Sequence, residues 1–171
     1  MPMIINPYID ILKEAAQFLD ARLSKLDHNA EGSDDPDQSG EYDSAEYITG
    51  LGFIACQQYM ACAFAGKGIN KRIALDLGPK HRCGVTFAAL VNAAANYWKH
   101  CTEWEGPNVD RVRVEQTSQP LQRLGVNIEQ SYALVNILHE ILRPHPPRFL
   151  HLVPFLERWH DAVLSNHAGR L

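Results

Sequence analysis

The 171-residue chain is predicted to be an all-α protein, a single helical bundle of about five main helices spanning residues 1–171. Three observations predict this class. Apolar residues recur at three- and four-residue steps over long segments, as in amphipathic helices. No stretch alternates between apolar and polar residues for long enough to form a strand. Apolar residues at 46% and charged residues at 21% are close to globular averages and indicate one folded domain.

The first helix is expected at Pro7–Leu26, where apolar residues line one side and charged residues the other. The segment that follows, from Asp27 to Glu41, holds six acidic residues and no Lys or Arg. We expect residues 27–43 to form a mobile acidic loop. Without those six, the 16 basic residues face 14 acidic ones, so the net charge of −4 belongs to this segment. No basic cluster typical of a nucleic-acid binder remains.

Two helices are expected to be central and buried. Ser44 is a suitable N-cap for a helix that continues to Phe64, and a second helix is expected at Val85–Trp104. The twenty residues 47–66 carry no formal charge, which is the length of a bilayer span. Glycines and polar side chains interrupt this segment, so we interpret it as a buried helix and expect no membrane association. A helix that is apolar on every side is expected to be covered on every side.

The remaining segments predict helices that are apolar on one side. A short helical turn is expected at Ser118–Gly125, a helix from Asn127 to the prolines that begin at Pro144, and a last helix at His151–Asn166. Together with the first helix, these can cover only part of two central helices. We therefore expect an exposed apolar face that closes against a second copy, giving a homodimer.

Cysteine spacing and motifs limit the chemistry. The chain has no CxxC pair, and its cysteines lie in or beside apolar helical segments, which favours reduced thiols and a cytoplasmic protein. No phosphate-binding, dinucleotide-binding or zinc-protease motif is present, so no cofactor and no metal-ligand set are expected. The four cysteines are Cys56, Cys62, Cys83 and Cys101.

The end of the second central helix carries the candidate site. Asn92, Asn96, His100 and Glu103 follow one another at steps of four, four and three, so they stack on one helix face, with Trp104 next to them. Buried amides and imidazoles need hydrogen-bond partners. The partners are either protein groups, in an internal network that fixes the helix register, or a ligand. In the second case these five residues form a binding site, and His100, Lys99 and Asn96 are the candidates for catalysis.

The segment from Asn92 to His100 resembles the helix-terminal motif of HEPN-type bundles, small all-α domains of bacterial toxin–antitoxin and phage-defence systems. This resemblance implies a dimeric, metal-independent ribonuclease with its site at the dimer cleft. His100 would then be the general base toward a ribose 2′-hydroxyl, Lys99 would stabilise phosphate charge, and Asn96 would orient the RNA. The family signature, an Arg followed by four to six residues and a His, is absent, because position 96 is Asn and Arg82 is too far upstream.

Three hypotheses about function follow from these observations. The first is a non-catalytic protein that acts by macromolecular interaction with a protein partner, in a regulatory, immunity or defence-associated role. The second is the HEPN-like ribonuclease or a degenerate relative. RNA is a partner only under this hypothesis. The third is a bundle that binds a metal or a small ligand at Asn92, Asn96 and His100.

Overall fold

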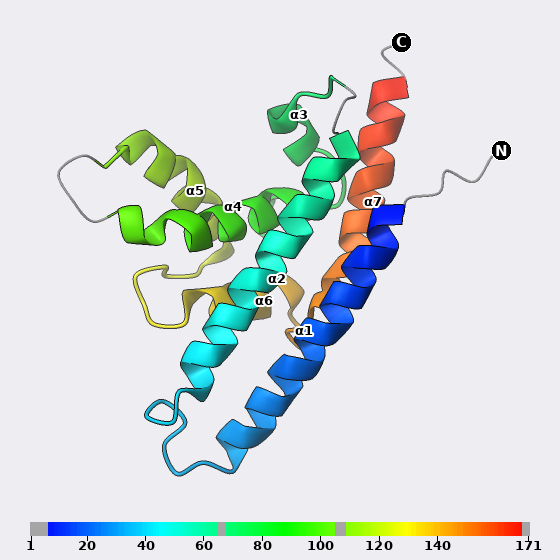
Figure 1. Ribbon diagram of the computed structural model, residues 1–171. Coiled ribbons are helices and arrows are strands. Elements are labelled where there is room, and N and C mark those ends of the chain that lie inside the picture. Colours follow the sequence, from blue (N-terminus) through cyan, green and yellow to red (C-terminus); the bar gives the residue numbers. More distant parts are fainter. Residues whose placement is uncertain (1–6, 65–67, 105–108, 169–171) are drawn as a thin grey trace.

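The computed structural model describes residues 7–64, 68–104 and 109–168, and over these residues the protein is all-α, as predicted (Figure 1). A single antiparallel β-bridge joins Lys80 to Thr86, and the described residues contain no β-strand beyond this bridge. The helices are α1 (Pro7–Glu31), α2 (Glu41–Phe64), α3 (Lys71–Leu75), α4 (Phe87–His100), the 3-10 turn η1 (Cys101–Glu103), α5 (Arg111–Leu124), α6 (Ala133–Leu142) and α7 (Phe149–Ala168).

The connection between α1 and α2 is shorter than the acidic loop expected over residues 27–43. α1 continues to Glu31 and α2 begins at Glu41, so residues 32–40 alone link them. Two residues of the acidic segment have partners elsewhere in the chain. Asp27 pairs with Arg148, which directly precedes α7, and the hydroxyl of Tyr132 donates to Asp37. Helical structure therefore covers both ends of the acidic segment.

α5 is a full helix where a short turn from Ser118 was expected. It begins at Arg111, because Asp110 is its N-cap and accepts a hydrogen bond from the backbone N–H of Arg113 at 3.2 Å. It ends, as expected, at Gly125, whose φ of 90° lies in the left-handed region. α3, capped by Asn70, is a further helix that the apolar pattern did not predict.

α6 begins six residues after the predicted start at Asn127, and its N-cap comes from another helix. Tyr132 precedes the first turn with a φ of 60° and offers no side-chain cap. The Glu46 carboxylate of α2 instead accepts from the backbone N–H groups of Leu134 at 2.9 Å and Val135 at 3.0 Å. Burial raises the pKa of Glu46 against the opposing effect of these two hydrogen bonds.

α1 caps α7 in the same way. The buried Asp20 carboxylate accepts from the N–H groups of Phe149 at 2.7 Å and Leu150 at 2.9 Å, so it satisfies two donors at the start of α7. The ring of Phe149 meets the ring of Phe53 edge to face. It lies against Gly52 of α2, where any Cβ would overlap it.

α2 packs against α1, α4, α6 and α7, and α4 packs against α2, α5, α6 and α7. The ring of Trp98 lies against Gly50, so a glycine of α2 lets α4 approach closely. Phe53 and Val91 are fully buried, whereas Tyr47 and Leu51 of α2 are 56% and 40% exposed. The outer side of α2 is therefore uncovered. In the described part of the chain, no helix is both long and apolar enough to cross a membrane.

All four cysteines are free. Cys56 is buried in the core, and burial raises the pKa of its thiol to about 12. The Cys56 thiol therefore stays protonated near neutral pH and packs as a small apolar group.

Replacing Asp20, the α1 residue that caps the start of α7, tests whether this contact stabilises the bundle. Asp20→Ala leaves two backbone N–H groups at the start of α7 without their acceptor, and we expect a loss of about 1–3 kcal/mol in the free energy of unfolding. Urea denaturation followed by circular dichroism measures this loss. The control is Asp10→Ala, an exposed acid on the same helix, expected to change stability by less than about 0.5 kcal/mol. Equal losses in the two variants would contradict the role of Asp20.

Candidate functional site

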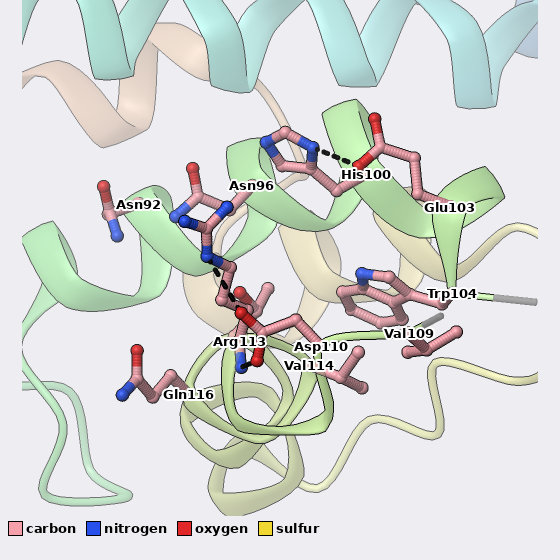
Figure 2. Close-up of a pocket in the computed structure, with 11 residues that line it drawn as sticks. Asn92, Asn96, His100, Glu103, Trp104, Val109, Asp110, Arg113, Val114 and Gln116 are labelled. Atoms are coloured by element: carbon pink, nitrogen blue, oxygen red, sulfur yellow. Dashed lines mark hydrogen bonds and ion pairs between the residues drawn. The ribbon is translucent and has the colours of Figure 1, made fainter. Parts of the chain in front are cut away.

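A polar cleft lies between α4 with η1 on one side and α5 on the other (Figure 2). Its volume is about 400 Å³. The five residues predicted as a binding site all line it: Asn92, Asn96, His100, Glu103 and Trp104. The structure therefore brings the predicted set together around one hollow.

The two asparagines are oriented by a glutamine of α2. Gln57 Nε2 donates to Asn92 Oδ1 at 2.9 Å and to Asn96 Oδ1 at 3.0 Å. Gln57 Oε1 accepts from Lys99 Nζ at 2.8 Å. An ammonium group can only donate, so the Gln57 oxygen must face Lys99 and its nitrogen must face the asparagines. Both asparagine oxygens consequently point toward α2, and both amino groups turn away from it (Figure 2).

His100 lies at the end of α4 and interacts with Glu103 of the same face. His100 Nδ1 and Glu103 Oε2 are 3.1 Å apart, and their side chains are 48% and 69% exposed. The indole of Trp104 meets the ring of Tyr97 edge to face at 5.5 Å, which fixes one wall of the cleft. His100 is therefore exposed, whereas Asn92 and Asn96 are half-buried.

Lys99 does not line the cleft. Its ammonium is drawn toward Gln57, and it lines a separate, smaller hollow with Gln57, Phe64 and Leu75. Partial burial lowers the pKa of Lys99, and the positive charge of Lys71 lowers it further. Of the three catalytic candidates, Asn96 and His100 line the cleft, whereas Lys99 does not and reaches Asn96 only through their shared partner Gln57.

Arg113 and Asp110 at the start of α5 also line the cleft, and neither was predicted from the sequence as a site residue. Asp110 Oδ2 lies 3.2 Å from Arg113 Nε, while Asp110 Oδ1 caps the helix. An Asp is a common N-cap residue, but the few apolar residues of α5 gave no helical pattern after Asp110 that would mark it as one. Gln57 was also not predicted as a site residue, because the sequence shows it only as a polar residue within a largely apolar helix.

The site combines an internal network with unused hydrogen-bonding capacity. Gln57 satisfies the asparagine oxygens, whereas the amino groups of Asn92 and Asn96 have no hydrogen-bond partner among the described residues. Within the same described ranges, no cluster of three or more His, Cys, Asp or Glu side chains has the geometry to hold a metal ion. The cleft therefore presents hydrogen-bond donors from α4 and charged groups from α5 and η1.

Comparison with family models, curated proteins and solved structures gave no match for this chain.

Proposed function

We propose that this protein is a non-catalytic helical bundle that acts by macromolecular interaction, in a regulatory, immunity or defence-associated role, and that it pairs with a second copy of itself. The observation that carries the proposal is an exposed apolar row on α1. Ile11 and Phe18 are 62% and 66% exposed, and Tyr8 is 48% exposed. At steps of three and seven residues these side chains share one face of the helix.

The neighbouring helix α2 also carries exposed apolar side chains. α1 and α2 run side by side (Figure 1), and α2 contributes the exposed side chains of Tyr47 and Leu51. Exposed apolar side chains gathered on one helix face are typical of an interaction site in soluble proteins. A second copy suits it, because two-fold pairing of α1 sets Ile11 of one chain near Phe18 of the other and covers both.

The arrangement of the candidate catalytic residues supports a non-catalytic role. Lys99 is engaged by Gln57 and lines a different hollow from His100. A general base and a phosphate-stabilising cation must meet at one reacting group. Lys99 and His100 are thus poorly placed to act together.

We predict that the wild-type protein sediments as a dimer at micromolar concentration. The double variant Ile11→Ser, Phe18→Ser is expected to sediment as a folded monomer, because it removes the two most exposed apolar side chains of the proposed interface. Analytical ultracentrifugation measures both. Val112→Ser is the matched control, since Val112 is 62% exposed but lies on α5, and this variant is expected to remain dimeric.

A monomeric wild-type protein would contradict the proposed pairing. A double variant that stays dimeric would contradict the assignment of the interface to α1. Circular dichroism of each variant establishes that the fold is retained.

A metal-independent ribonuclease is the second candidate, and one observation favours it. Arg113 lines the same cleft as His100, so a cation from α5 lies near the imidazole although the sequence lacks the Arg signature. Arg113 could stabilise phosphate charge in the role that the resemblance gave to Lys99.

The ribonuclease candidate predicts cleavage of single-stranded RNA in the presence of EDTA. His100→Ala and Arg113→Gln are each expected to reduce the cleavage rate by about 100-fold or more, as for loss of a general base or a charge-stabilising group. Arg111→Gln, at an exposed position of the same helix, is the control and is expected to retain the rate. Absence of cleavage by the wild-type protein, or cleavage that survives both substitutions, would exclude this candidate.

A further inference from the structure

We propose that the cleft between α4 and α5 binds a small zwitterionic organic molecule. Its carboxylate would be held by Asn92, Asn96 and Arg113, and its ammonium group would lie toward Glu103 and Trp104. This site is separate from the apolar row of α1 and does not depend on pairing of two copies.

The donor end of the site follows from the orientation of the two asparagines. Their oxygens accept from Gln57, so the amino groups are the part of each side chain left to meet a ligand. Figure 2 shows the nitrogen atoms of Asn92 and Asn96 on the side of the cleft that faces α5, and Arg113 of α5 lines the same cleft. An oxyanion offers several acceptors to a group of donors of this kind.

Arg113 presents an exposed guanidinium to the cleft, with 84% of its side chain accessible. Asp110 binds its Nε atom, and Asp110 is itself fixed by its role as the N-cap of α5. The two terminal guanidinium nitrogens have no partner among the described residues, so they are available to a ligand. A guanidinium presents such nitrogens as a planar fork that matches the two oxygens of a carboxylate.

The acidic residues of the cleft indicate that the ligand also carries a positive charge. The carboxylates of Glu103 and Asp110 outnumber the single guanidinium of Arg113, so a ligand with only negative charge meets net repulsion. Glu103 and Trp104 lie at the opposite end of the cleft from Asn92 (Figure 2). A carboxylate and an indole ring are both favourable neighbours for an ammonium group. The volume of about 400 Å³ suits a small molecule.

A titration with three related compounds tests the proposal on the ¹⁵N-labelled protein. The probes are 4-aminobutyrate, butyrate and butylamine, and inorganic phosphate is the fourth arm. The side-chain NH₂ signals of Asn92 and Asn96 report binding. We expect saturable shifts with 4-aminobutyrate at concentrations about threefold or more lower than with butyrate, because its ammonium group adds an ion pair with the exposed Glu103 carboxylate. We expect no saturable shift of these signals with butylamine.

Three outcomes of this titration would overturn the proposal. If no probe shifts the two NH₂ signals, the cleft is not a site for this class of ligand. If butyrate binds as tightly as 4-aminobutyrate, the ligand is not zwitterionic. If phosphate binds more tightly than 4-aminobutyrate, the site selects a phosphate group.

Gln57→Glu provides a variant test of the donor arrangement. A glutamate at this position can only accept, so it would turn the amino groups of Asn92 and Asn96 toward itself and their oxygens into the cleft. We expect the affinity for 4-aminobutyrate to fall by about tenfold or more. Gln58→Glu, one residue along on the exposed side of α2, is the matched control and is expected to keep the affinity.

Asn96→Asp keeps an acceptor for Gln57 and replaces the amino group by a negatively charged oxygen, so it tests the same arrangement without changing α2. The expected result is again a loss of about tenfold or more. Backbone NMR spectra establish that each variant is folded. Unchanged affinity in both folded variants would overturn the proposed role of the asparagine amino groups.

Discussion

The hydrogen bonds of Gln57 determine how α2 and α4 present the cleft. One carboxamide contacts three groups of α4, since it donates to Asn92 and Asn96 and accepts from Lys99. Partly buried amides without partners would destabilise the fold, so this contact favours a single register of α4 on α2. It also fixes which end of each asparagine faces the cleft. Both the packing and the chemistry of this region follow from the same side chain.

The bundle is held together by interactions between elements that are distant in sequence. Asp20 of α1 caps α7, and Glu46 of α2 caps α6, so the two longest helices position the starts of two others. Close approach at Gly50 and Gly52 lets aromatic rings lie directly on the α2 backbone. The hydroxyl of Tyr97 donates to the carbonyl of Ile128 at 2.9 Å and links α4 to the segment that follows α5. These contacts fix the packing of the helices against which α4 lies.

The amino-acid sequence predicted the helical class and one face of the cleft, because both depend on local spacing. The apolar residues of α1, α2, α4 and α7 recur at three- and four-residue steps that can be recognised in the sequence alone. The same spacing placed Asn92, Asn96 and His100 on one face. Gln57 could not be assigned, because its partners lie 35 and 39 residues away. Likewise, the start of α6 depends on Glu46, which is 88 residues before Leu134.

Neutron diffraction from a crystal of the deuterium-exchanged protein most directly tests the orientation of the asparagine amides, because it distinguishes nitrogen from oxygen and locates the exchanged hydrogens. The result expected is Gln57 donating to the oxygens of Asn92 and Asn96, with both ND₂ groups directed into the cleft. Asparagine oxygens that face the cleft, or a Gln57 side chain that contacts neither residue, would contradict this account of the site.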